Sequence, residues 1–378
     1  MGMWIVILGT TMLAALGALV YLISRFAKFE QIKKRGGERK GRRILVATVP
    51  VVLIIALTTG IFGIMNMMVI TITLSLFWLC CDLAALIVKH YRTGKSPKCY
   101  VAGICALVFT FLYFVCGWIL AHHVFETDVT VRSAKIAEPL QIVLFADAHV
   151  GTTFDGAEMQ KDMQRISAKE PDAVVIAGDL IDDNTSYEDM VNACRALGTL
   201  QTKYGVFFVY GNHDKGYAAG GRGYGYQELE AELTKNHVVI LEDVSHELTD
   251  TVTLTGRADA STGRSEGGYT MGQREDIATL LADIPADRYR IVIDHQPNDY
   301  DAEAAAGADL VLSGHTHGGQ LFPINHVGEW IGANDNTYGR ERRGNTDFII
   351  TSGISAWEIP FKTGCKSEYV LIRLKPEP

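Results

Sequence analysis

Residues 311–320 read Val-Leu-Ser-Gly-His-Thr-His-Gly-Gly-Gln and set two histidines beside glycines where an apolar run ends. The run at 309–312 is predicted to be a buried strand. On extended backbone His315 and His317 would point to the same side, with Cα atoms about 6.5 to 7 Å apart. Two metal ions about 3.5 to 4 Å apart, as in dinuclear hydrolytic sites, could take one ring each. The pair alone fits two solvated loop histidines equally well, so other clusters of ligand-type residues have to decide.

Four more clusters of ligand-type residues follow apolar runs in the second half of the chain. The runs and the clusters after them are 142–145 with Asp147 and His149, 173–176 with Gly178 and Asp179, 206–209 with Asn212, His213 and Asp214, and 291–293 with His295. Asp, Asn and His together suit a borderline divalent cation. Open α/β sheets bind ligands at the carboxyl ends of their strands, so five such clusters favour a metal site. Asp182 and Asp183, after the second run, have a second interpretation as caps of a helix that begins near residue 187.

Helical patterns separate these apolar runs. They lie at 157–169, 187–202, 226–235 and 272–281. Short apolar runs that alternate with helical stretches predict an α/β fold. The later runs at 348–350 and 369–374 are expected to close a second sheet. The roughly 250 residues of this part of the chain are enough for a core of their own.

Charge divides the 378-residue chain into two physically different parts. Residues 1–125 hold 13 Lys plus Arg against 3 Asp plus Glu, a net charge of +10, and residues 126–378 hold 22 against 40, a net charge of −18; the sum is the −8 of the whole chain. We therefore predict a basic, apolar region at 1–125 and an acidic domain at 126–378. The acidic domain disfavours nucleic acid as a partner, because nucleic-acid phosphates need a basic face.

The basic region contains four apolar stretches that are expected to cross a membrane as helices. They lie at about 3–24, 44–62, 66–88 and 100–121. The run from 44 to 88 would make a single helix of about 68 Å, roughly twice the hydrocarbon thickness, so we divide it near Gly60 and Gly63. Asp82 is the one acidic or basic residue in that run, and it is expected to meet water or Lys89 at the end of its span.

Lys and Arg gather between the first and second stretches and between the third and fourth, in segments 25–43 and 89–98. Such charges mark cytoplasmic loops, so the domain at 126–378 is expected outside the cytoplasm. The positive charges follow the first apolar stretch, which favours a retained anchor over a cleaved signal peptide. The expected localisation is that of a multi-pass membrane protein with an extracytoplasmic domain.

The order and spacing of the motifs resemble the calcineurin-like metallophosphoesterase family. The matching segments are Asp147-Ala148-His149, Gly178-Asp179-Leu180-Ile181-Asp182, Gly211-Asn212-His213-Asp214, His295 and Gly314-His315-Thr316-His317. Gly318-Gly319-Gln320, and Thr351-Ser352-Gly353 with Pro360, are similar to the bacterial membrane-associated phosphodiesterase branch, which usually has Leu at the position of Ala148. The likeness covers roughly 140–374 and leaves the apolar stretches outside it.

The resemblance implies a four-layer αββα sandwich of two mixed sheets, here preceded by four transmembrane helices. It implies a first metal held by Asp147, His149, Asp179 and His317, and a second held by Asp179, Asn212, His295 and His315. It gives His213 the role of orienting or protonating the leaving oxygen, with support from Asp214. The expected cofactors are two divalent ions, with Mn²⁺ as the first expectation and Fe, Zn or Mg as alternatives. Water activated by these ions is the expected nucleophile.

Three arginines are candidates for binding a substrate phosphate, because guanidinium groups pair with phosphate oxygens. They are Arg222, Arg257 and Arg340. Each also fits an ordinary surface arginine. Arg222 lies in the glycine-rich segment 216–226, which lacks the Lys-Ser or Lys-Thr ending of a nucleotide-binding P-loop and is expected to be a mobile loop beside the site.

The residues and the resemblance together predict a membrane-anchored dinuclear metal phosphoesterase that hydrolyses a phosphodiester or a phosphomonoester. Tethering near lipid head groups favours a phospholipid or a cell-envelope precursor as the substrate. A phosphatase or nucleotide phosphodiesterase for soluble extracellular substrates is the alternative within the same class. A metal-binding membrane scaffold without turnover is the alternative outside it. The sequence leaves protein partners and oligomeric state open.

Overall fold

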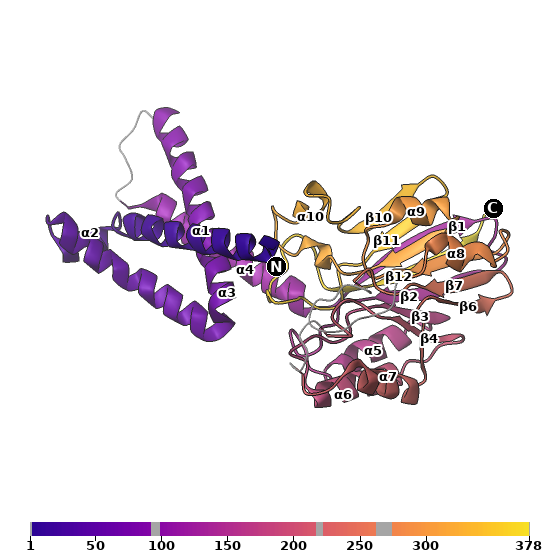
Figure 1. Cartoon of the computed structure of the whole chain (residues 1–378). Helices are drawn as coiled ribbons and strands as arrows, with labels where there is room; N and C mark the ends of the chain where they lie inside the picture. Colours follow the sequence, from indigo (N-terminus) through magenta and orange to yellow (C-terminus); the bar gives the residue numbers. More distant parts are fainter. Residues whose placement is uncertain (1, 92–98, 217–221, 262–273, 378) are drawn as a thin grey trace. The chain divides into compact units, whose positions relative to one another are not determined.

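The computed structural model describes residues 2–91, 99–216, 222–261 and 274–377. The chain divides into two compact units, residues 1–115 and 116–378. Unit 1 is helical and unit 2 contains all the strands of the described residues (Figure 1). The division falls within helix α4 (Val101–His122), so the last two turns of α4 belong to unit 2. Residues 217–221 of the predicted glycine-rich loop lie outside the described residues.

Unit 1 consists mainly of long apolar helices. They are α1 (Gly2–Phe26), the short α2 (Glu30–Gly36), α3 (Lys40–Tyr91) and the first part of α4. Among the described residues three helices, α1, α3 and α4, are long and apolar enough to cross a membrane.

The prediction of four transmembrane helices is therefore wrong, because three such helices are found. The expected second and third spans, 44–62 and 66–88, both lie within the 52 residues of α3, one on each side of a kink. Gly63 lies between them with the non-helical angles φ 81° and ψ 172°, a conformation that essentially only glycine adopts. The structure thus keeps the predicted break at Gly63, and the two predicted spans are the two arms of α3 on either side of it.

Asp82 of α3 is paired with basic side chains. Its Oδ2 atom lies 3.1 Å from Arg25 Nε and 3.3 Å from Lys28 Nζ. Its Oδ1 atom accepts a hydrogen bond from Tyr100 Oη at 2.6 Å. The sequence predicted that Asp82 would meet water or Lys89, and the structure instead pairs it with Arg25, Lys28 and Tyr100. They offset the cost of placing a charge among apolar helices.

Unit 2 contains two six-stranded mixed sheets, with the strand orders β1-β12-β2-β3-β4-β5 and β10-β11-β9-β8-β7-β6. The first sheet consists of β1 (Phe125–Ser133), β12 (Glu368–Pro376), β2 (Leu140–Phe145), β3 (Ala173–Ala177), β4 (Gly205–Val209) and β5 (Val238–Ile240). The second consists of β10 (Gly339–Arg343), β11 (Thr346–Ile350), β9 (Leu310–Ser313), β8 (Tyr289–Ile293), β7 (Val252–Gly256) and β6 (Val244–Thr249). The pairs β12–β2, β10–β11 and β6–β7 are antiparallel, and the other neighbours are parallel.

Six α-helices and one 3₁₀ turn are described in unit 2 besides the end of α4. They are α5 (Met159–Ser167), α6 (Tyr187–Leu197), α7 (Tyr226–Lys235), α8 (Ile277–Ala282), α9 (Tyr300–Ala305), α10 (Val327–Trp330) and η1 (His317–Gly319). The first three contribute to a core on the outer face of the first sheet. Helices α8 and α9 contribute to a core on the outer face of the second, where Tyr300 stacks on Phe348 with ring centroids 3.7 Å apart.

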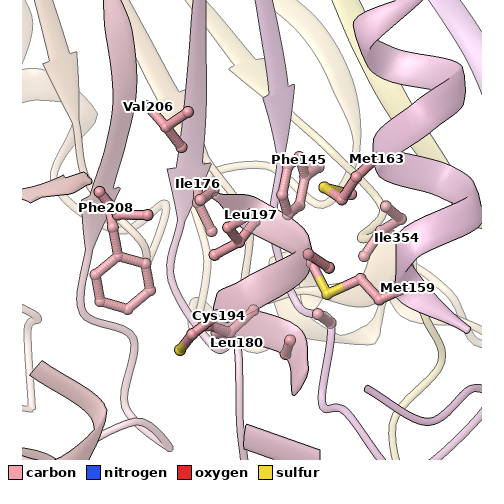
Figure 2. Close-up of a cluster of buried hydrophobic side chains, with 14 of the residues drawn as sticks. Phe145, Met159, Met163, Ile176, Leu180, Cys194, Leu197, Val206, Phe208 and Ile354 are labelled. Atoms are coloured by element: carbon pink, nitrogen blue, oxygen red, sulfur yellow. The ribbon is translucent and has the colours of Figure 1, made fainter. Parts of the chain in front are cut away.

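Alternation along the strands creates these layers, because successive residues of a strand point to opposite faces. On β2, Ile142 and Leu144 belong to the core between the two sheets. Val143 and Phe145 belong to the core under α5 and α6. Figure 2 shows Phe145 near Met163 of α5 within this second core. The order helix, sheet, sheet, helix confirms the predicted αββα class.

One strand assignment from the sequence is wrong. The run at 369–374 forms β12, which lies in the first sheet between β1 and β2 and not in the second sheet. Strand β1 has a largely polar sequence and carries no apolar run that would reveal it. Its pairing joins Phe125 to Glu368, two residues far apart in the sequence, and a local hydrophobic pattern does not encode such a partner.

Phe145→Ala tests the contribution of the core under α5. Phe145 is fully buried, and removing such a ring costs about 3 to 5 kcal/mol because a cavity remains. We expect the melting temperature of unit 2 to fall by roughly 10 °C, measured on the detergent-solubilised full chain. Val244→Ala, at a position 48% exposed, is the control and should change it little. Equal melting temperatures for the two variants would contradict this assignment of the core.

Candidate metal centre

The ends of five strands bring the predicted ligands together. The loops after β2, β3, β4, β8 and β9 carry, in that order, Asp147 with His149, Asp179, Asn212, His295, and His315 with His317. Strands β2, β3 and β4 are parallel neighbours in the first sheet, as are β8 and β9 in the second. Parallel neighbours end at the same edge of a sheet, so loops from both sheets contribute to one site.

Five of these ligand residues have left-handed backbone. Their φ angles are 54° at Asp147, 36° at His149, 53° at Asp179, 70° at His315 and 49° at His317. Non-glycine residues adopt this region at a cost, and they hold it only where surrounding contacts over-determine the conformation. The backbone N–H groups of Asp147 and His149 donate to the carbonyls of Gly178 and Asp179 at 3.0 and 3.1 Å. The loops after β2 and β3 therefore hold each other in place.

Two glycines in the motifs leave no room for a side chain. A Cβ atom on Gly314 would lie 2.6 Å from Asp147 Oδ2, and one on Gly211 would collide with Asp179 Oδ1. Both clashes are with carboxylates of the predicted ligands. The glycines are therefore required because the loop backbones pass directly against the ligand atoms.

The first cluster consists of Asp147, His149 and His317, which are all buried. The Nε2 atoms of His149 and His317 lie 3.2 Å apart. His317 Nε2 lies 3.7 Å from Asp147 Oδ1. Two ring nitrogens and a carboxylate oxygen thus face one point.

The second cluster consists of Asp179, His295 and His315. His295 Nε2 lies 3.2 Å from Asp179 Oδ2 and 3.1 Å from the amide oxygen of Asn212. The ring centroids of His295 and His315 lie 5.1 Å apart. Asn212, predicted as a ligand, therefore lies with this cluster.

Asp179 connects the two clusters. Its Oδ2 atom lies 3.2 Å from His295 Nε2 and 3.6 Å from His149 Nε2, so one oxygen faces both. Its Oδ1 atom accepts a hydrogen bond from the backbone N–H of His213 at 2.8 Å. The side chain is only 1% exposed.

The electrostatics of the site reflect this crowding. Burial raises the pKa of Asp147 to about 6. Burial acts to raise the pKa of Asp179 too, but His295 and His213 outweigh it and hold that pKa well below its ordinary value. Burial lowers the pKa of His315 to about 4, and with His149 it holds the pKa of His317 well below its ordinary value. His315 and His317 are therefore neutral near pH 7, which is the state in which imidazole binds metal.

The residues present fit two divalent cations. Carboxylate, imidazole and amide donors suit Mn, Fe, Zn or Mg to different degrees. His295 Nδ1 lies 2.7 Å from the carbonyl of Ala177, so this nitrogen carries a proton and Nε2 is the nitrogen that could bind a cation beside Asp179. Such an outer hydrogen bond is usual for a metal-binding histidine.

Asp214 connects loops through the backbone. Its carboxylate accepts hydrogen bonds from the N–H groups of Gly211, Asp179, Leu180 and Ile181, at 2.7 to 3.2 Å. Burial raises the pKa of Asp214 to about 7, while these four donors favour its ionised form. Asp214 thereby fixes the loops after β3 and β4 against each other, and its support of the His213 tautomer stays a prediction.

The three arginine candidates make contacts that stabilise the structure. Arg257 is 3% exposed and its Nη1 lies within 3.2 Å of three carboxylates, those of Asp294, Asp299 and Glu303. These contacts favour a structural role for Arg257, because its guanidinium is buried beside three anionic partners. Substrate binding by Arg257 stays a prediction.

Arg340 and Arg222 also bond to neighbouring groups. Arg340 Nη2 lies 2.8 Å from Asp347 Oδ1, and its Nη1 donates to the carbonyl of Thr130. Arg222 Nη2 donates to the carbonyl of Asp214 at 2.8 Å. The contacts of Arg340 stabilise the edge of the second sheet, whereas Arg222 lies against the loop that carries His213.

Sequence reasoning placed neither Trp357 nor Lys362 beside the metal ligands. The Trp357 ring lies 6.2 Å from the His317 ring and nearly parallel to it, and 5.3 Å from the His213 ring. Gln320 fixes the Trp357 backbone through two hydrogen bonds, to its carbonyl at 3.0 Å and from its N–H at 3.2 Å. Gln320, in the segment Gly318-Gly319-Gln320 that resembles the family, was the signal that could have indicated this position of Trp357.

Lys362 and its neighbours join the site to the end of α4. Lys362 is fully buried, and its Nζ donates to the carbonyls of Ser352 and Gly353 at 2.5 and 3.2 Å. Its backbone N–H donates to the carbonyl of Gly117 in α4 at 2.9 Å. Cys365 Sγ lies 3.0 Å from the carbonyl of His317. Nothing in the local sequence pattern indicates these contacts.

Comparison with known proteins identifies relatives of unit 2. A family model described as calcineurin-like phosphoesterase matches residues 140–319. The chain is 29% identical over 250 residues to an uncharacterized metallophosphoesterase of Campylobacter jejuni. The aligned region covers 66% of this chain and 62% of that protein. It is 31% identical over 245 residues to a transmembrane protein with metallophosphoesterase domain of Bos taurus. That aligned region covers 63% of this chain and 54% of the bovine protein.

A third relative is covered more fully. The chain is 30% identical over 205 residues to an uncharacterized metallophosphoesterase of Aquifex aeolicus. The aligned region covers 52% of this chain and 71% of that protein. The Campylobacter and bovine proteins are matched over only about half to three fifths of their length.

His317→Ala tests the first cluster. Its Nε2 faces His149 and Asp147, so we expect the variant to lose at least one of two cations per chain. Elemental analysis of the solubilised full chain after equilibration with Mn²⁺ measures this. His326→Ala is the matched control, because the His326 side chain is 49% exposed and pairs with Glu329, and it should keep both cations. Full metal content in His317→Ala would remove this residue from the ligand set.

Proposed function

Because the chain belongs to the calcineurin-like metallophosphoesterase family, we propose that it is a membrane-anchored phosphoesterase that hydrolyses a phosphodiester or a phosphomonoester. The observation that carries the proposal is the convergence of the first and second ligand clusters, with the Asp179 carboxylate between them. Six ligand atoms converge, five of them from buried residues, and a purely structural role would not favour this arrangement because burial of charge without a counter-charge is costly.

In this proposal the first cation takes the first cluster together with Asp179, and the second takes the second cluster together with Asn212. Bound there, the cations supply Lewis acidity and lower the pKa of a water molecule enough for it to attack phosphorus near neutral pH. The chain holds the cations with loops whose left-handed backbone is fixed by contacts across the site. Manganese is the first choice of metal in the proposal, and Fe, Zn and Mg are the alternatives for the same two positions.

His213 takes the role of orienting the leaving oxygen. Its backbone N–H is bonded to Asp179 Oδ1, and the next residue, Asp214, bonds four backbone amides. These five hydrogen bonds hold the His213 backbone firmly beside the second cluster. Its ring centroid lies 5.1 Å from that of His149, and Trp357 lies on another side at 5.3 Å.

Anchoring supports a substrate at the membrane surface. The described residues include three helices that could cross a membrane, and the bovine relative is named as a transmembrane protein. An enzyme held at a bilayer meets phosphate esters of that surface at high effective concentration. We therefore propose a phospholipid or a cell-envelope precursor as the substrate. The second candidate is a soluble extracellular phosphate ester.

The domain is proposed to lie outside the cytoplasm. Both ends of α3 adjoin basic segments, 25–43 and 89–98. If α3 crossed the bilayer once, one of these segments would lie outside, against the preference of Lys and Arg for the cytoplasmic side. The break at Gly63 allows α3 to cross twice. Four crossings then place the amino terminus and unit 2 on the outer side.

Hydrolysis of bis(p-nitrophenyl) phosphate and of p-nitrophenyl phosphate tests the proposed function. The solubilised full chain should release p-nitrophenolate with Mn²⁺ and not after chelation by EDTA. His317→Ala should lose this turnover, and His326→Ala should retain it. A chain that binds metal but turns over neither ester with any divalent cation would be the non-catalytic scaffold.

His213→Ala separates leaving-group chemistry from metal binding. We expect normal metal content and a loss of about 10²-fold or more on esters with alkoxide leaving groups, as for a general acid. Turnover of p-nitrophenyl esters should fall much less, because p-nitrophenolate needs little help to leave. Rates of a series of aryl and alkyl esters measure the difference. An equal loss across the series would contradict this role of His213.

An epitope after Pro378 tests the orientation. In intact cells it should be accessible to an antibody or to proteinase K, because four crossings leave the carboxyl terminus outside. An epitope between Glu38 and Arg39, in the basic segment, is the matched control and should be reached only after the cells are permeabilised. The opposite pattern would reverse the proposed orientation.

A further inference from the structure

Exposed apolar side chains of unit 2 gather in two short segments. Ten large apolar side chains are exposed among the described residues of this unit. Five of them form what we call the apolar surface, namely Phe322, Ile324, Val327, Trp330 and Ile331, with 39% to 70% of each residue exposed. Two more, Trp118 and Ile119, lie in the last two turns of α4. Contiguous exposed apolar residues usually mark an interaction site.

The segment 361–364 joins the apolar surface to the end of α4. The Phe361 ring lies 5.9 Å from the Trp118 ring. On the other side, the backbone N–H of Thr363 donates to the carbonyl of Gln320 at 2.7 Å, and its Oγ1 accepts from the N–H of Phe322 at 3.1 Å. Both exposed apolar segments are therefore held to the same short stretch of backbone within unit 2.

Polar contacts hold the inner side of α10 and leave its apolar residues outward. Glu329 Oε1 accepts a hydrogen bond from the backbone N–H of Thr337 at 2.8 Å and lies 3.0 Å from His326 Nδ1. Trp330, the next residue, is 70% exposed. The apolar surface is thus presented by a segment with internal hydrogen bonds.

We propose that the apolar surface inserts into the lipid interface of the bilayer that α4 crosses. This inference rests on the membrane anchoring in the proposed function. Helix α4 is a candidate span, so its last turns mark the depth at which the chain leaves the hydrocarbon. The surface bonded to those turns through residues 361–364 reaches the same depth. Trp330 and Trp118 are of the residue type that favours the membrane–water interface.

Insertion has a direct consequence for the metal centre. The apolar surface begins five residues after His317, and only η1 and a short loop separate them. An inserted surface holds the ligand clusters at the level of lipid head groups. The phosphate of an amphiphilic ester would then reach the site while its apolar part stays in the bilayer.

Site-directed spin labelling of the full chain in lipid nanodiscs tests the insertion. A nitroxide is placed at Trp330→Cys, in a background without the other reactive cysteines, and Ile324→Cys is a second probe in case the first variant does not fold. Val244→Cys, exposed on β6 of the same unit, is the matched control. Collision rates are measured with oxygen, which concentrates in lipid, and with the neutral, water-soluble Ni–EDDA complex.

We expect the ratio of oxygen to Ni–EDDA collisions at residues 330 and 324 to exceed the ratio at 244 severalfold. A ratio equal to that at 244 would show a water-exposed surface and overturn the inference. Low collision rates with both reagents would show a surface covered by protein, either unit 1 or a second copy, and would also overturn it.

Turnover of bis(p-nitrophenyl) phosphate by the unlabelled chain in the same nanodiscs separates the two proposals. Turnover together with water-exposed labels rejects insertion alone. Lipid-exposed labels without turnover, with any divalent cation, support insertion and reject the phosphoesterase alone.

Discussion

The burial of one carboxylate between two sets of imidazoles is the constraint on which unit 2 depends. Asp179 is almost fully buried, and a single oxygen of its side chain faces His149 on one side and His295 on the other. A carboxylate in such a place is stable only with positive charge beside it. Burial acts to lower the pKa of His295, but Asp179 outweighs it and holds that pKa well above its ordinary value. Divalent cations held by the two ligand clusters would supply positive charge beside Asp179 as well.

The rest of the fold holds these ligands in place although their burial and their backbone conformation are unfavourable. Three parallel strands fix the loops of the first sheet, and two fix those of the second. Asp214 then gathers four amides from two of the loops, and glycines such as Gly314 let the backbones approach the ligands. The ligand residues with left-handed backbone are conformationally unfavourable, and the surrounding contacts must offset this free energy. The apolar cores on both faces of each sheet supply the rigidity that makes such a geometry tolerable.

Much of this was predictable from the sequence, because short-range patterns carry it. The apolar runs indicated most central strands, and the order of the motifs from Asp147 to His317 identified the family, which the comparisons confirm. Properties that depend on distant partners were not predictable. The sheet that contains β12, the three carboxylates around Arg257 and the contacts of Lys362 all involve residues far apart in the chain. Four helices were predicted where three are found, because the second and third predicted spans are the two arms of α3 on either side of Gly63.

The bonding of segment 362–367 to α4 has a consequence for truncation. The backbone N–H groups of Lys362 and Ser367 donate to the carbonyls of Gly117 and Leu120, while Cys365 contacts the carbonyl of His317. A fragment cut at the charge boundary after Phe125 would remove both acceptors and leave this stretch without its support beside a metal ligand. The last two turns of α4 are thus part of the minimal folding unit of the domain, and a water-soluble version must retain them with their apolar faces replaced by polar ones.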